Sequence, residues 1–110
     1  MVITIFRSRL DAKNEAEYRV AAERMREIAM GMPGLVSFKA FAADDGERLS
    51  MIVFDSVEAQ KAWREHPEHR EAQRRGWESF YSEFSLVVCE NPRLISKGSP
   101  PWAQPARRLE

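Results

Sequence analysis

The stretch PGLVSFKAFAADDGERLSMIVFD, residues 33–55, decides the fold that the rest of the chain completes. Two runs rich in β-branched and aromatic residues flank Asp44-Asp45-Gly46. This arrangement predicts a β-hairpin with strands over residues 35–43 and 49–55. Pro33-Gly34, just before the first strand, predicts the end of a preceding helix.

The residues before the hairpin predict one strand and one helix. Residues 2–9 are rich in β-branched side chains and predict a strand. Asn14, followed three residues later by Glu17, predicts a capping box at the start of a helix. Between residues 15 and 32 the apolar side chains recur in steps of three and four, which indicates one buried helical face. These side chains are Tyr18, Ala21, Met25, Ile28 and Met32.

The residues after the hairpin predict a broken helical unit and a last strand. A short helix capped by Asp55 or Ser56 runs to about residue 65, with Ala59, Ala62 and Trp63 inward. Pro67 suits the first turn of a second helix over about residues 68–81, and residues 84–90 predict a strand. The inner face of the second helix is predicted to hold His69, Ala72, Gln73, Gly76 and Phe80.

The order β-α-β-β-α-β predicts an α+β protomer of the ferredoxin-like, split βαβ type. Four antiparallel strands then carry the helices on one face. The strands are apolar on both faces, as in residues 51–54 and 86–89, although a sheet with one wet face should alternate. We therefore expect a homodimer that packs sheet against sheet as an α+β barrel; the alternative is that Trp102 and the C-terminal tail cover the open face.

Length and composition predict one domain over residues 1–91 and a proline-rich tail over residues 92–110. The chain has 110 residues, and its tail holds four of the six prolines. This composition predicts a segment without regular structure, either disordered or laid as an arm on a partner.

The charge balance excludes whole classes of partner. Lys plus Arg and Asp plus Glu both number 17, so no net positive field attracts a nucleic acid or an anionic membrane.

No apolar stretch approaches the roughly 18 residues of a membrane span, and the N-terminus lacks the pattern of a signal peptide. The lone Cys89 permits no intrachain disulfide and is expected to be buried and inert. We expect a cytoplasmic protein.

His69 is the strongest candidate for chemistry, because a histidine on the inner face of a helix can exchange a proton near neutral pH or ligate haem iron. The competing interpretation is a packed, hydrogen-bonded histidine. His66 and His69 lack the third ligand and the spacing of a zinc site, so no metal is expected. Trp63, Trp77, Phe80 and Tyr81 either wall a pocket for a flat ligand or pack the core. No nucleotide-binding glycine loop is present.

Three segments carry a resemblance to a known family. MPGLVSF at residues 32–38, followed by the hairpin, resembles the start of the second strand in the antibiotic biosynthesis monooxygenase superfamily. AWREHPEHREAQ at residues 62–73 resembles its tryptophan–proline–histidine helix pair, and FYSEF at residues 80–84 fits the entry into its last strand. The likeness covers about residues 1–90. It is specific to the superfamily and poorly specific to substrate.

The resemblance implies a ferredoxin-like protomer in a dimeric barrel. Some members oxidise polyphenols or quinols with O2 and no cofactor, others degrade haem, and others are isomerases. Trp63 matches the tryptophan that flanks the pocket, and His69 matches a histidine common in monooxygenase-like members. Haem-degrading members place the iron ligand one turn later, where this chain has Gln73, and carry an asparagine on the first strand, where it has Arg7 or Ser8.

Three functions follow as hypotheses. The first is a cofactor-independent monooxygenase of a small hydrophobic or aromatic substrate, with His69 as base or anchor. Trp63, Gln73, Trp77 and Phe80 would then bind the substrate. The second is haem binding or degradation with His69 as the axial ligand. The third is a dimeric module that binds a small ligand without catalysis.

Overall fold

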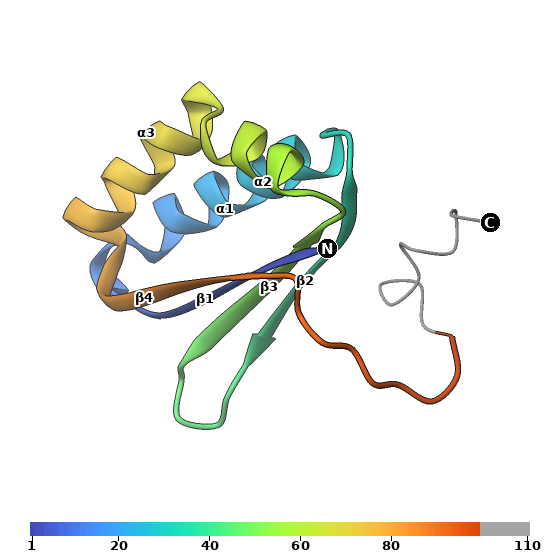
Figure 1. The fold of residues 1–110 in the computed structure, drawn as a ribbon. Helices are drawn as coiled ribbons and strands as arrows, with labels where there is room; N and C mark the ends of the chain where they lie inside the picture. Colours follow the sequence, from blue (N-terminus) through green and yellow to red (C-terminus); the bar gives the residue numbers. More distant parts are fainter. Residues whose placement is uncertain (100–110) are drawn as a thin grey trace.

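A computed structural model describes residues 1–99 and shows an α+β fold with helices on one face of a four-stranded sheet (Figure 1). The elements, in chain order, are β1 Val2–Leu10, η1 Ala12–Asn14, α1 Glu15–Met30, β2 Leu35–Ala42, β3 Arg48–Phe54, α2 Val57–Arg64, α3 Pro67–Arg75, η2 Gly76–Phe80 and β4 Tyr81–Glu90. The sheet order is β2-β3-β1-β4, and every neighbouring pair is antiparallel. The ferredoxin-like prediction is confirmed.

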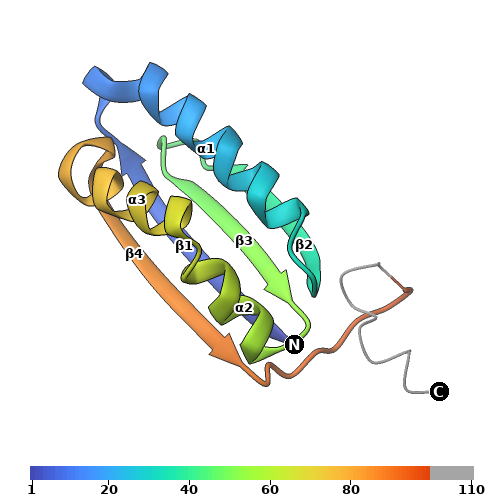
Figure 2. The ribbon, with the colours of Figure 1, turned by 90° about the horizontal axis from the view of Figure 1, so that it is seen from above.

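The helices form two rows above the sheet, with α1 on one side and α2 followed by α3 on the other (Figure 2). The buried core lies beneath them and includes Ile28, Ile52, Phe54 and Trp63. Full burial of each such side chain contributes about 1.5–3 kcal/mol to folding. Ser56 begins α2 by accepting a hydrogen bond from the Ala59 amide at 3.1 Å, as one of the two predicted caps. Ala62, predicted inward, is exposed.

The predicted capping box at Asn14 is wrong. The chain enters α1 through the 3-10 turn η1, and Asn14 there makes no cap hydrogen bond. Its side-chain amide instead donates to the main-chain oxygen of Ser79 at 2.7 Å. Asp11 caps η1 by accepting from the Lys13 amide at 3.0 Å. Asn14 therefore ties the start of α1 to η2.

The second helical unit ends at Phe80, close to the predicted end, but its last turn, from Gly76, is π-helical. α3 stops at Arg75, η2 follows, and β4 begins at Tyr81 rather than residue 84. A Cβ atom at Gly76 would lie 2.7 Å from Cε2 of Tyr81, so the absence of a side chain lets the Tyr81 ring lie against the turn. This close approach brings the start of β4 under the helices.

The face of the sheet away from the helices is lined mainly by apolar side chains, and charged side chains lie at one end of it. Register places Ile5, Met51 and Val87 on this side, and Val87 is 51% exposed. After β4 the chain descends on the same side (Figure 1), and Val53 there is fully buried. Residues 91–99 form no helix or strand. Trp102, the predicted anchor of the tail, lies outside the described residues.

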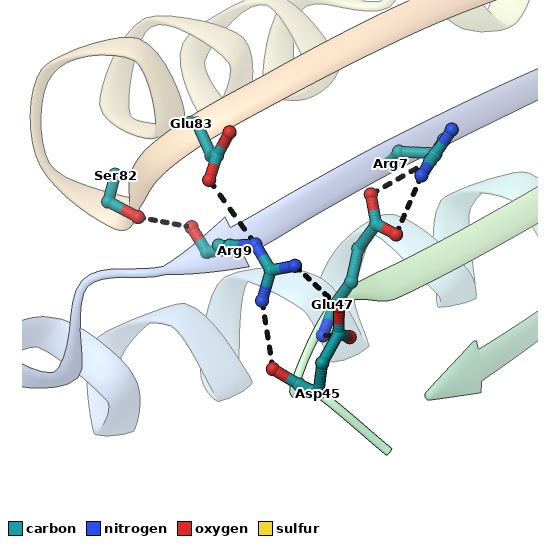
Figure 3. Close-up of polar contacts among 6 residues, drawn as sticks. All are labelled: Arg7, Arg9, Asp45, Glu47, Ser82 and Glu83. Atoms are coloured by element: carbon teal, nitrogen blue, oxygen red, sulfur yellow. Dashed lines mark hydrogen bonds and ion pairs between the residues drawn. The ribbon is translucent and has the colours of Figure 1, made fainter. Parts of the chain in front are cut away.

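Arginine–carboxylate pairs close this side at the hairpin end of the sheet (Figure 3). Arg7 forms a two-point pair with Glu47, both contacts at 2.8 Å. Arg9 contacts Asp45 at 2.8 Å and Glu83 at 3.2 Å.

Within residues 1–99, no helix is long and apolar enough to cross a membrane.

Candidate functional site

The break between α2 and α3 places His69 directly on Trp63. α2 ends at Arg64 and Pro67 starts α3, so the chain turns back within two residues. The two rings stack with centroids 4.2 Å apart and planes 19° apart. Nδ1 of His69 lies 3.1 Å from the main-chain oxygen of Trp63. The imidazole is therefore held on both its face and its edge.

The surroundings of His69 favour its neutral form. Burial lowers the pKa of the His69 imidazole below its ordinary 6.5, against the opposing effect of the Arg64 and Trp63 carbonyls. A carbonyl only accepts hydrogen bonds, so the contact with Trp63 assigns the ring proton to Nδ1. Nε2 therefore carries an available lone pair near neutral pH.

His66 has a different task. Its Nδ1 accepts a hydrogen bond from the Glu68 amide at 3.1 Å, which makes it the N-cap of α3. Since a capping acceptor occupies an otherwise unpaired helix amide, His66 serves the position of α3 and thereby the placement of His69. The residues described contain no group of three or more side chains arranged to hold a metal ion.

Buried polar groups lie close to the Trp63–His69 pair. Gln60, one turn before Trp63, is buried and donates to the Thr4 hydroxyl at 3.4 Å. The indole Nε1 of Trp63 is buried with no hydrogen-bond partner among the described residues. The sequence analysis missed Gln60, although its spacing of three from Trp63 places both on one helical face.

A second candidate surface is an apolar strip on β4, at the edge of the sheet. Phe84, Leu86 and Val88 pair across the ladder with Ser8, Phe6 and Thr4. Partners in an antiparallel ladder share a face, so the strip lies on the helix side. Its three side chains are nevertheless 38–47% exposed, which shows that α2 and α3 leave this edge uncovered. An aromatic ligand would find apolar contact here.

The structure separates the predicted site residues into three environments. Phe80 is buried in the core, edge-on to Tyr18 at 5.9 Å. Trp77 is 75% exposed and contacts Phe84 edge-on at 5.3 Å, so it lies beside the apolar strip and away from the core. Gln73 is exposed, contrary to its predicted place on the inner face. The inner face of α3 instead follows His69, Ala72 and Gly76.

These features define a class of protein: a ferredoxin-like α+β domain in which a histidine stacks on a buried tryptophan of the helical layer. The sequence model of the antibiotic biosynthesis monooxygenase family matches residues 1–75. The chain belongs to this family.

Relatives of known sequence or structure support the assignment. An uncharacterised protein of Bacillus subtilis, YqjZ, is 29% identical over 86 residues, which are 78% of this chain and 75% of YqjZ. The structure of Rv0793 from Mycobacterium tuberculosis has a TM-score of 0.74 at 18% identity, covering 86% of this chain and 98% of Rv0793. A protein from Deinococcus radiodurans, provisionally assigned as an antibiotic biosynthesis monooxygenase, has a TM-score of 0.76 at 15% identity and covers 90% of this chain and all of its own.

Proposed function

We propose that this protein is a cofactor-independent monooxygenase that oxidises a small aromatic or quinol-type substrate with O2. The observation that carries the proposal is His69, whose ring is stacked on Trp63 and whose Nδ1 lies on the Trp63 main-chain oxygen, so that the lone pair of the neutral ring is on Nε2. A general base must be unprotonated at the working pH and must have a fixed direction. Membership of the family supports the same reaction class.

The reaction requires two things of the protein: a base that removes a proton and a binding site that excludes water. His69 Nε2 accepts a proton from the substrate, and the resulting anion is electron-rich enough to reduce O2 directly. One oxygen atom ends in a new carbonyl group of the substrate, and the other leaves as water with the two hydrogens that the substrate loses. Trp63 supports the base, while the apolar strip of Phe84, Leu86 and Val88 contacts the ring.

Oxygen uptake with anthrone and a panel of quinols tests the proposal, with spontaneous oxidation subtracted. His69→Ala should lower kcat/KM by about 100-fold or more, the usual range for loss of a general base. Arg70→Ala is the matched control, because it removes an exposed side chain of α3 next to His69 and keeps the His66 cap of that helix; it should retain the wild-type turnover. Equal turnover by the wild type and His69→Ala would contradict the role of His69.

Haem binding is the second candidate, and the same imidazole favours it. A ligating histidine typically holds its other ring nitrogen on a carbonyl or carboxylate, as Nδ1 of His69 does. His69 thus fits an axial ligand, and bound haem would supply iron and O2 chemistry. A haemin titration should then give a Soret shift that His69→Ala abolishes; a shift indifferent to His69 removes this candidate. If neither haem nor an oxidisable substrate responds to His69, the third hypothesis, ligand binding without catalysis, is favoured.

We also propose that two copies associate through the sheet face away from the helices. Val87 and Phe41, both on that face, are 51% and 48% exposed in the single chain. Exposed apolar patches of this kind mark interaction sites. The two-faced apolar strands are the sequence feature that predicts the association. A cytoplasmic location stays a prediction.

A further inference from the structure

Arg48 occupies an unusual place on the inner side of the sheet. It is the first residue of β3, and its ladder partners are the buried Ser8 on β1 and Ala42 on β2. Since antiparallel partners share a face, Arg48 lies on the helix side with Thr4 and Ser8. It is the one basic residue that the register places on this side of the described sheet.

Arg48 lacks the carboxylate partners that other arginines of the sheet possess. Arg7 and Arg9, on the opposite face, are paired with Glu47, Asp45 and Glu83 (Figure 3). Among residues 1–99, no carboxylate lies within ion-pair distance of Arg48. A half-buried guanidinium is costly to leave without a negative partner, so this position favours an anion from outside the chain.

The guanidinium of Arg48 lies over Tyr18, and Tyr81 lies next to Tyr18. The central carbon of the guanidinium lies 5.9 Å from the centre of the Tyr18 ring. Tyr18 in turn meets the Tyr81 ring edge-on at 5.7 Å. Tyr81 is fixed against Gly76, whose missing side chain leaves room for the ring. Elements α1, β3 and β4 therefore bring one cation and two phenol groups together under the helices.

The Tyr81 hydroxyl keeps its proton at neutral pH and is a hydrogen-bond donor. Burial raises the pKa of Tyr81 most, and the neighbouring Tyr18 raises it further. Arg48 acts in the opposite direction without reversing the shift. A protonated phenol donates a hydrogen bond to an anionic oxygen, and the guanidinium adds charge-assisted donors.

The same tyrosine connects this cluster to the apolar strip. The Tyr81 ring lies 5.2 Å from the Phe6 ring and 5.8 Å from the Phe84 ring. A flat ring resting on the strip near Phe84 therefore has Tyr81 beside it. We propose that Arg48, Tyr18 and Tyr81 bind an anionic oxygen carried by an aromatic ligand, which makes ionised aromatics the preferred substrate class. This proposal rests on the monooxygenase proposal for the identity of the ligand as substrate.

Isothermal titration with two matched probes tests the site. The first probe is 2-hydroxy-1,4-naphthoquinone, which is ionised at neutral pH, and the second is its neutral methyl ether. The wild type should bind the anion about tenfold or more tightly than the ether, as expected for charge-assisted hydrogen bonds. Arg48→Met should remove this preference while leaving the affinity for the ether within about twofold, and Arg48→Lys should keep part of it.

Arg26→Met is the matched control, because Arg26 also stacks on a ring, that of Phe38 at 5.6 Å, from an exposed position on α1. It should keep the full preference for the anion. Naphthalene-2-carboxylate and naphthalene-2-carboxamide repeat the comparison for a carboxylate, and a preference confined to one pair tells which anionic oxygen fits.

Several outcomes would overturn the proposal. The first is a wild type that binds neither of the two anions more tightly than its neutral partner. The second is an Arg48→Met protein that keeps the preference, as it would if Arg48 only stacked on Tyr18. The wild-type comparison requires no variant to fold, and circular dichroism checks each variant that is used. Oxygen uptake that depends on His69 but not on Arg48 would retain the monooxygenase and reject the anion site, so the two proposals fail separately.

Discussion

At the scale of single residues, the site depends on how each side chain is held. Trp63 and His69 are packed ring on ring, and the main-chain oxygen of Trp63 fixes the imidazole edge. The indole Nε1 is buried without a partner among the described residues, so it contributes desolvation cost and no hydrogen bond. Packing is therefore the contribution of Trp63 to stability.

A pair of substitutions tests this division of roles. Trp63→Ala should cost about 3–5 kcal/mol of unfolding free energy, the range for deletion of a large buried ring. Trp63→Phe should cost markedly less, because it keeps most of the apolar volume and loses no hydrogen bond. Chemical denaturation measures both, and a Trp63→Phe cost equal to that of Trp63→Ala would reveal an indole hydrogen bond in solution.

The lowered pKa of His69 predicts a pH-dependent contribution to stability. In the unfolded chain the imidazole protonates near its ordinary 6.5, whereas the folded protein resists protonation to lower pH. The unfolded state then binds more protons, so stability falls as the pH drops through this window and the penalty vanishes above it. The melting temperature of the wild type relative to His69→Gln should decrease between about pH 8 and about pH 5.5. A difference that stays constant with pH would contradict the shift.

Among the helices and strands, the π-helical turn η2 is the element that the sequence did not predict. Strong local signals predicted the hairpin, the end of α1 near Pro33 and the start of α3 at Pro67. The π-helical turn was not predicted, because no spacing or capping signal distinguishes it from a continued α-helix; in the structure it coincides with the close approach of Gly76 to the Tyr81 ring, five residues further on. The early start of β4 and the outward position of Gln73 belong to the same region.

Gly76→Ala measures the cost of closing this contact. The added methyl group would lie 2.7 Å from the Tyr81 ring and should destabilise the fold by about 1–3 kcal/mol. Gly31→Ala is the matched control, since its Cβ would meet only main-chain oxygens at 3.7 and 3.8 Å, an ordinary contact. Thermal denaturation should separate the two variants clearly. Similar melting temperatures would show that η2 adjusts freely.

At the scale of the whole molecule, the pairing of strands decides which side chains can cooperate. In the sequence Arg7, Arg9 and Arg48 are equivalent cations near strands. The register places Arg7 and Arg9 on one face with carboxylates, and Arg48 on the other with tyrosines. Composition and spacing contain no such information, so the candidate site was predicted only as far as Trp63 and His69. Phe84, Leu86, Val88 and Gln60 required the folded sheet.

The proposed dimer yields a prediction at this scale. Val87→Lys places a charge on the helix-free face and should raise the dimer dissociation constant at least about tenfold, since burial of an unpaired ammonium is costly. Val20→Lys, at a 74% exposed position on α1, should leave association unchanged. Sedimentation velocity measures both. A monomeric wild type, or a dimer insensitive to Val87→Lys, would contradict sheet-to-sheet association.

The proposed function depends on a neutral His69 whose Nε2 acts as the base. Nitrogen-15 NMR of the imidazole, recorded across a pH titration, measures its tautomer and its pKa together. We expect a proton on Nδ1 at neutral pH and a pKa below 6.5, the ordinary value. A proton on Nε2, or a pKa at or above 6.5, would contradict it.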